Sequence, residues 1–268
     1  MANRTSESPT ILIERPADHV AEIVMDRPDA LNAVDTRQAA AIAGACAELS
    51  ADDQVRVVIL RTALTKAFCV GADLKERNRL SNDDLAAQRP QSRRAYNAVL
   101  ELPMPTIAAV EGFALGGGCE LALSCDLIIA ADSAVFALPE VGVGVIPGGG
   151  GTQLLSRRVG LNRAADLIFT TRRVPAEEAY AIGLADRRVP TGEARRAARE
   201  LAAEIATKSP VALRNAKRAL RTGFDLPIAE ALEVEDRCWR ATAMSADRAE
   251  GVAAFVEKRS PHWAGSVD

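Results

Sequence analysis

Two glutamates, Glu120 and Glu140, lie in a stretch of the sequence that is rich in glycine and hydrocarbon side chains, with Asp126 and Asp132 as the other carboxylates between them. A buried carboxylate costs free energy unless it is paired or protonated. Burial also raises the pKa of a carboxyl group toward the value that a proton-transfer group needs near neutral pH. The pair therefore indicates acid–base chemistry, although each residue alone also fits a simpler role, Glu120 in the first turn of a helix and Glu140 in a solvent-facing turn.

Two glycine runs, at 116–118 and 148–151, accompany these carboxylates. Glycine has no Cβ atom, so each run can present backbone N–H groups to a ligand at close range. Neither run continues as the G-x-x-x-x-G-K-[ST] motif of a phosphate loop, and no G-x-G-x-x-G with an acidic partner follows a strand. Nucleotide hydrolysis and NAD binding are therefore weak alternatives.

The elements that must position these residues alternate between strand and helix. We expect strands at 11–13, 20–25, 55–60, 106–110, 127–130 and 135–137, helices at 35–49 and 87–102, and further helices opened by the glycine runs. Residues 65–73 are expected to form a loop. The alternation predicts βαβ units with right-handed crossovers, and glycines at the strand-to-helix turns place the ligand groups at one end of the sheet.

The last third of the chain is predicted to be helical. We expect helices at 163–169, 175–182, 193–208, 211–221, 228–244 and 247–258. Pro175, Pro210 and Pro227 each stand at or just before a helix start, where proline is favoured. No linker-like composition separates this region from the rest, so it is expected to pack on the core or on another subunit.

Composition excludes several classes of protein. A net charge of −3 disfavours a nucleic-acid binder that works by bulk electrostatics. The five cysteines include no C-x-x-C pair and only two histidines are present, so we expect no metal site. The N-terminus has no apolar core typical of a signal peptide, and no apolar run reaches the length of a membrane span. We therefore expect a cytoplasmic protein that does not bind membranes.

Several motifs, in the same order, resemble those of the crotonase superfamily, whose best-known members are enoyl-CoA hydratases. They are DRPDALNA at 26–33, KAFCVGADLK at 66–75, the glycine-rich stretch at 112–153 and EGVAAFVEKR at 250–259. The resemblance covers nearly the whole chain. It implies an α/β fold with a crotonase-like ββα spiral core at 1–200, which holds a CoA-thioester site, and a C-terminal helical trimerisation region at 201–268. Members of the family form homotrimers, commonly paired into hexamers.

The resemblance also implies where a thioester reacts. The carbonyl oxygen would lie in an oxyanion hole formed by the backbone N–H groups of Ala72 and Gly117, whose fixed dipoles stabilise an enolate. Glu120 would be the base for attack of water at Cβ, and Glu140 the acid that protonates Cα. Gly148 matches the glycine whose N–H helps to place that water. Many members without hydratase activity lack one glutamate, so the presence of both implies an enoyl-CoA hydratase.

Other positions match the part of the family site that binds coenzyme A. They are Ala30, Leu31, Val70, Ala72, Asp73, Leu74, Lys75 and Lys258. Lys75 and Lys258 match positions near the nucleotide and its phosphates, although a solvated lysine is the common alternative for both. The resemblance implies no metal and no separate cofactor, because coenzyme A enters as part of the substrate.

Alternatives remain open at the level of the sequence. A double-bond isomerase would use Glu140 alone to shuttle a proton, and other crotonase-type acyl-CoA lyases share the same motifs. A noncatalytic or RNA-binding protein on this fold is a rival of another class. A missing glutamate or a basic stripe would favour it, whereas this chain has both glutamates and a negative net charge. Residues 78–90, expected as a polar loop, are predicted to line the pocket for an acyl chain whose length the sequence does not indicate.

Overall fold

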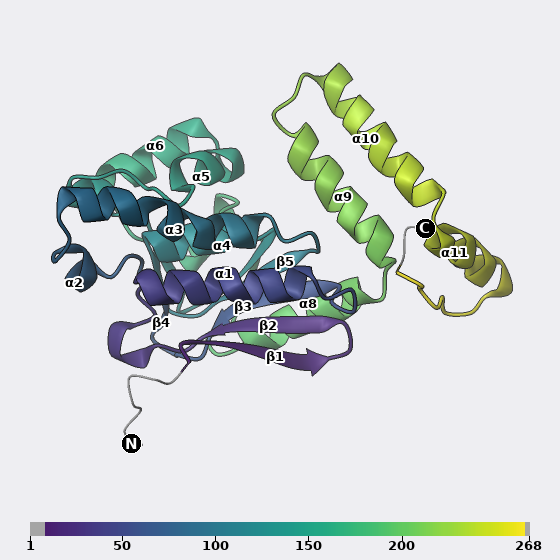
Figure 1. The fold of residues 1–268 in the computed structure, drawn as a ribbon, viewed down its shortest axis with the longest axis horizontal. Coiled ribbons are helices and arrows are strands. Elements are labelled where there is room, and N and C mark those ends of the chain that lie inside the picture. The colour runs from purple at the N-terminus through teal and green to yellow at the C-terminus, as the bar shows by residue number, and fades with distance from the viewer. Residues whose placement is uncertain (1–8, 266–268) are drawn as a thin grey trace.

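The computed structural model describes residues 9–265, which form two sheets surrounded by helices (Figure 1). The larger sheet has the strand order β1-β2-β3-β5-β7-β10. Its strands are β1 (Ile11–Ala17), β2 (Val20–Met25), β3 (Val57–Thr62), β5 (Thr106–Val110), β7 (Leu127–Ala131) and β10 (Arg187–Val189). The β1–β2 pair is an antiparallel hairpin, and the other neighbouring strands are parallel.

The smaller sheet has the strand order β4-β6-β8-β9. Its strands are β4 (Ala67–Cys69), β6 (Phe113–Leu115), β8 (Val135–Ala137) and β9 (Val174–Pro175). Strands β4, β6 and β8 each follow a strand of the larger sheet and pair in parallel with one another. The chain therefore repeats a unit of two strands, one in each sheet, before the next helix. This repetition is the predicted ββα spiral.

Helices cover the sheets and continue alone to the C-terminus. They are α1 (Thr36–Ser50), α2 (Leu74–Arg77), α3 (Asn82–Leu100), α4 (Gly117–Ser124), α5 (Gly151–Val159), α6 (Leu161–Thr170), α7 (Ala176–Ala181), α8 (Ala194–Ala206), α9 (Pro210–Gly223), α10 (Ile228–Ala243) and α11 (Ala246–Glu257), with 3-10 turns η1 (Pro28–Ala30) and η2 (Glu140–Val143). Among the described residues, none of these helices combines the length and apolarity that crossing a membrane requires.

Successive residues of β3 point to opposite faces of the larger sheet, so the strand contributes to two cores. Val58 and Leu60 join the main core, which contains residues of α1, α3 and α4. Val57 and Ile59 join a second core, where small residues of α8 such as Ala198 and Ala202 allow that helix to lie close to the sheet. Strand β3 is therefore buried on both faces, which is typical of a parallel strand with a nearly continuous apolar run. The site elements therefore stand on a rigid base.

The predictions of two loops, at 65–73 and 78–90, are partly wrong. Residues 65–73 contain the short strand β4, which was not recognised because three residues carry no detectable alternation. Residues 78–90 are mostly helical, since α3 begins at Asn82, after a capping box in which the Ser81 side chain accepts from the Asp84 N–H and the Asp84 carboxylate accepts from the Ser81 N–H. Pro90 lies inside α3 on an exposed face, where water can bind the carbonyl that proline leaves unpaired.

The last three helices extend away from the sheets (Figure 1). Helices α9 and α10 pack against each other as a hairpin, and α11 follows beside the end of α10. Buried Lys217 of α9 fixes the hairpin to the sheets, because its Nζ lies 2.7 Å from Asp126 Oδ2 and donates to the Met104 carbonyl at 2.9 Å. The division of the chain after residue 200 stays a prediction. That position lies within α8, and α9 begins at Pro210.

Candidate active site

Glu120 is a buried carboxylate held by the second glycine run. It lies in the first turn of α4 and is 3% exposed. Its Oε1 accepts hydrogen bonds from the backbone N–H groups of Gly149, at 2.6 Å, and Gly151, at 2.8 Å. Burial raises the pKa of Glu120, while these two N–H groups act in the opposite direction because they stabilise the anion. The first-turn placement was one of the two predicted roles, and the burial shows that the residue does not simply face solvent.

Glu140 lies beside the first glycine run. It begins η2, and its Oε1 lies 2.9 Å from the point that a Cβ atom on Gly116 would occupy. Its Oε2 is buried and has no hydrogen-bond partner among the described residues. Burial first, and then the charge of Glu120, raise the pKa of Glu140 to about 7. Glu140 can therefore hold or release a proton near neutral pH, and its unpaired oxygen is free to bind a ligand or water.

The loops that carry Ala72 and Gly117 meet at the same place. A Cβ atom on Gly71 would lie 2.9 Å from the nitrogen of Gly117, and the φ angle of Gly71 is +89°. Glycine is required at position 71 because a Cβ atom would clash with Gly117 and because side chains rarely adopt this φ angle. Within residues 9–265, the N–H groups of Ala72 and Gly117 have no hydrogen-bond acceptor. The structure thus brings close together the two loops that carry these unused donors, as an oxyanion hole requires.

Residues of the DRPDALNA motif, together with Val34 directly after it, hold the Ala72 loop in place. Val34 donates to the Gly71 carbonyl at 2.7 Å and accepts from the Asp73 N–H at 3.0 Å, which leaves the N–H of Ala72 unused. The buried side chain of Asn32 donates to Phe68 O and to Thr62 Oγ1. Arg27 donates to Asp73 Oδ2 at 2.9 Å. The motif therefore works by fixing the loop that follows β4.

The predicted coenzyme A positions fall into two groups, one of seven residues near the Ala72 loop and one that contains Lys258 alone. Leu31 and Val70 are adjacent, because the Val70 N–H donates to the Leu31 carbonyl at 3.3 Å, and Ala30 precedes Leu31 in η1. Asp73 caps α2, where Leu74 and Lys75 are exposed. Lys258 lies at the end of α11, on the opposite side of the molecule from α2 (Figure 1). Within one chain the structure brings the first seven positions together and leaves Lys258 apart from them.

Several neighbours of the two glutamates were missed by sequence reasoning. Gly149 and Gly151 belong to the predicted glycine run, yet the run alone did not indicate that they bind Glu120. Gly148, the predicted water-placing residue, accepts a 2.6 Å hydrogen bond from Arg89 through its carbonyl. Tyr96 of α3 packs against Gly149. Arg89 and Tyr96 had no sequence signal, because they belong to a helix whose position beside the glycine runs is decided by the fold.

The other residues considered from the sequence have structural roles. Cys69 and Cys119 are buried, and burial raises the pKa of both thiols, as expected for small apolar side chains. Asp126 accepts a hydrogen bond from the backbone N–H of Thr106, at the start of β5. His19 donates from Nδ1 to the Gln54 carbonyl at 2.8 Å, away from the glutamates.

Comparison with known proteins identifies the family. A sequence model described as enoyl-CoA hydratase/isomerase matches residues 15–266. The chain belongs to the enoyl-CoA hydratase/isomerase family. Family membership makes it an enzyme of hydratase/isomerase type with a crotonase fold.

Individual relatives agree with this family. A human mitochondrial protein named as enoyl-CoA hydratase domain-containing protein 2 is 42% identical over 93% of this chain and 87% of its own length. Human mitochondrial methylglutaconyl-CoA hydratase is 42% identical over 81% of this chain and 65% of its own. The crystal structure of an enoyl-CoA hydratase from Bacillus anthracis superposes with a TM-score of 0.94 at 38% identity, covering 96% of this chain and all of that one.

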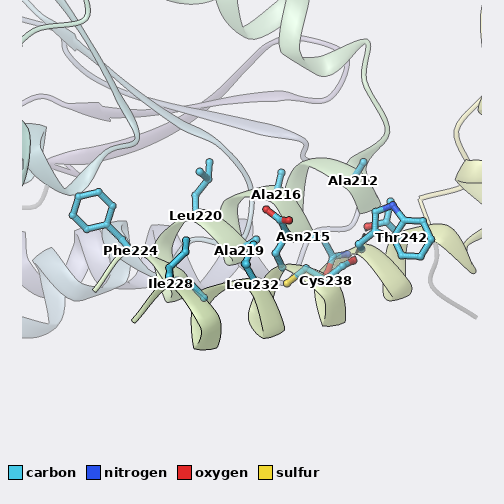
Figure 2. A pocket seen from close by; sticks show the side chains of 14 residues that line it. Ala212, Asn215, Ala216, Ala219, Leu220, Phe224, Ile228, Leu232, Cys238 and Thr242 are labelled. Carbon is cyan, nitrogen blue, oxygen red and sulfur yellow. Dashed lines mark hydrogen bonds between the residues drawn. The ribbon is translucent and has the colours of Figure 1, made fainter. Parts of the chain in front are cut away.

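A second feature of this family member lies away from the glutamates. An apolar groove of about 600 Å³ runs between α9 and α10 (Figure 2). Large apolar side chains that are more than half exposed in the single chain line it, namely Leu220, Phe224, Ile228, Leu232 and Trp239. A contiguous exposed apolar surface is typical of an interaction site.

Proposed function

We propose that the protein is an enoyl-CoA hydratase, which adds water reversibly to the double bond of a 2-enoyl-CoA thioester. The observation that carries the proposal is the convergence of Glu120, Glu140 and the unused N–H groups of Ala72 and Gly117. The two glutamates can transfer protons, and the two backbone N–H groups can stabilise a developing negative charge. Hydration of a conjugated thioester needs both functions at once.

In the proposed reaction Glu120 takes a proton from water as the water oxygen forms its bond to Cβ. The electrons of the double bond move toward the thioester oxygen, where the N–H groups of Ala72 and Gly117 stabilise the enolate. An oxyanion donor of this kind contributes about 3–4 kcal/mol to the transition state. Glu140 then gives its proton to Cα, and the carbonyl re-forms. Atoms and charges balance without a metal or redox cofactor, and coenzyme A is part of the substrate.

The environments of the two carboxylates support this division of roles. Two backbone donors stabilise the anion of Glu120, which suits a base. The pKa of Glu140 is raised to about 7 and its Oε2 is unpaired, which suits an acid. Pairs of titratable groups whose surroundings differ in this way are typical of acid–base catalysts. The proposed role of Gly148 is to help position the attacking water through its N–H, and Leu31, Val70 and Lys75 are proposed to contact coenzyme A.

A steady-state assay with crotonyl-CoA tests the reaction. We expect the absorbance of the conjugated thioester to fall as water adds. Activity on a 3-enoyl-CoA with no loss of crotonyl-CoA absorbance would replace the hydratase proposal by an isomerase. A panel of 2-enoyl-CoA thioesters of increasing length then defines the acyl chain.

The Glu140→Gln variant tests the role of that residue. We expect turnover to be abolished while affinity for a CoA thioester survives, because the amide keeps the shape of the side chain and loses its proton-transfer capacity. Unchanged turnover would remove Glu140 from the mechanism. Loss of turnover with unchanged binding also separates an enzyme from a noncatalytic binding protein on the same fold. Only an enzyme has a measurable turnover to lose.

The groove between α9 and α10 supports the further proposal that the protein forms a homotrimer or a pair of trimers. Its apolar residues are exposed in the single chain, and burying apolar surface stabilises an assembly by roughly 25 cal/mol per Å². The helical hairpin extends from the sheets, so a second copy can reach it (Figure 1). A cytoplasmic location stays a prediction, and some relatives are named as mitochondrial.

A further inference from the structure

Tyr96 lies where the glycine runs meet. It belongs to α3 and is 6% exposed. A Cβ atom on Gly149 would lie 2.7 Å from the Tyr96 ring, and a Cβ atom on Gly117 would overlap the hydroxyl oxygen. The same Cβ position on Gly117 is 3.4 Å from Cα of Gly71. The ring therefore packs on one glycine run, and its hydroxyl reaches the junction of the two loops that carry the unused N–H donors.

The hydroxyl of Tyr96 has no acceptor in the part of the chain that the structure describes. Packing against Gly149 accounts for the aromatic ring, yet it does not account for the oxygen, which lies at the junction of the two loops without a protein partner. Glu120 is near enough for its charge to act on Tyr96, but no hydrogen bond joins its carboxylate to this hydroxyl, and its Oε1 accepts from the N–H groups of Gly149 and Gly151. The acceptor for this hydroxyl is therefore to be sought in a bound molecule.

The hydroxyl can act as a donor because it stays protonated. Burial, and then the negative charge of Glu120, raise the pKa of Tyr96 above its ordinary value. A phenol that keeps its proton at neutral pH can donate a hydrogen bond to a developing negative charge without transferring the proton. The nearest groups with the same function are the N–H groups of Gly117 and Ala72.

We propose that the Tyr96 hydroxyl is a third hydrogen-bond donor to the thioester oxygen of the substrate, beside the N–H groups of Ala72 and Gly117. This inference rests on the proposed hydratase function. As water adds to Cβ, negative charge builds up on the thioester oxygen, and the phenol hydrogen bond strengthens with it. The proton stays on Tyr96, and Glu140 still supplies the proton that Cα receives. Three donors hold an oxyanion more firmly than two.

The kinetic test compares two tyrosine-to-phenylalanine variants. Tyr180 is the one other tyrosine of the sequence and is 55% exposed on α7, so Tyr180→Phe is the matched control. We expect Tyr96→Phe to lower kcat with crotonyl-CoA by about 10- to 100-fold, with KM changed by less than about twofold. The phenylalanine ring keeps the contact with Gly149, so thermal unfolding should match that of the control. An unchanged kcat, or a change confined to KM, overturns the proposal.

A spectroscopic test separates this proposal from the hydratase proposal. The probe is a cinnamoyl-CoA with an electron-donating amino group on its ring, because its absorption moves to longer wavelength as the carbonyl is polarised. We expect the shift on binding to be large for the wild type and for Tyr180→Phe, and clearly smaller for Tyr96→Phe. An equal shift in all three proteins rejects Tyr96 as a donor and leaves the hydratase proposal intact. Absence of probe binding to the wild type rejects both.

A crystal structure of the wild-type protein with the same probe gives an answer that does not depend on folding of a variant. A distance under about 3.2 Å between the hydroxyl oxygen of Tyr96 and the thioester oxygen supports the proposal. A distance above about 4 Å overturns it, because no hydrogen bond spans that gap.

Discussion

The backbone N–H of Gly149, in the loop before α5, donates a 2.6 Å hydrogen bond to Oε1 of Glu120, a residue of α4 that lies 29 positions earlier in the chain. The N–H of Gly151 binds the same oxygen. These contacts fix one oxygen of Glu120 and stabilise its anion. Glu140 receives no comparable support on its buried Oε2. The two carboxylates of the site thus differ in environment, and the first two of five testable predictions concern the carboxylate that lacks this support.

The raised pKa of Glu140 predicts the pH dependence of activity. As the proposed acid, Glu140 must be protonated when the substrate binds, and its pKa is about 7. We therefore expect kcat/KM for crotonyl-CoA to fall as the pH rises through about 7, since this ratio reports the free enzyme. A profile measured between pH 5 and 9 checks this. A flat profile up to pH 9 would contradict the acid role.

The same pKa predicts a pH dependence of stability. The pKa of Glu140 rises from 4.5 to about 7 on folding, so the folded protein binds more protons than the unfolded chain between these values. The resulting penalty is absent below pH 4.5 and complete above pH 7. We expect the Tm of Glu140→Gln to exceed that of the wild type at pH 8 and to equal it at pH 4. Equal Tm values at both pH values would show that the carboxyl group is not destabilised by burial.

Gly118 and Gly44 predict opposite effects of the same substitution. A Cβ atom on Gly118 would overlap the carbonyl of Cys69, which is backbone and cannot turn aside. Gly118→Ala should therefore destabilise the fold by at least about 2 kcal/mol. Gly44 lies inside α1 with no atom near its Cβ position, so Gly44→Ala should stabilise the protein by about 0.5–1 kcal/mol. Urea unfolding of both variants measures these changes, and equal effects would reject the packing at Gly118.

The buried contact between Lys217 and Asp126 predicts how firmly the helical hairpin is attached. Lys217→Met should destabilise the protein by about 2–3 kcal/mol, because Asp126 loses one of its two cations and keeps Arg221. Lys208→Met, at an exposed position of the preceding segment, is the control and should change little.

The pKa of Asp126 is lowered, so its contribution to the free energy of unfolding is present above pH 3.8 and is lost as the pH falls through the lowered value. The difference between variant and wild type should shrink accordingly in acid. A difference that is small at pH 7 would contradict the role of Lys217.

The groove between α9 and α10 predicts the effect of a charge on assembly. Leu232→Glu places a carboxylate among the apolar residues of the groove, and we expect it to dissociate the proposed trimer. Tyr180→Glu, on exposed α7 outside the groove, should leave the assembly intact. Sedimentation velocity measures both. A wild-type monomer, or a Leu232→Glu protein of unchanged mass, would contradict assembly through this groove.

The sequence by itself determined the family, the alternation of strands and helices, and the types of residue at the candidate site. These features depend on short-range information: β5 is predicted at 106–110 from its apolar residues, and the helix beginning at Ile228 from the proline before it. The motif order from Arg27 to Lys258 carried the resemblance. The sequence also paired Ala72 with Gly117 through that resemblance, although nothing in their spacing places them together.

The tertiary structure alone decided which groups meet. The three-residue strand β4 exists because it pairs with β6 of the smaller sheet. Helix α3 starts earlier than expected because a capping box stabilises its first turn. The contacts of Glu120 with Gly149, and of Tyr96 with Gly117, join segments that are distant in sequence. Such contacts depend on how helices pack over the glycine runs. Packing depends on the whole chain. Residue patterns therefore indicated the chemistry, whereas the fold determined which residues contact the groups of the candidate site.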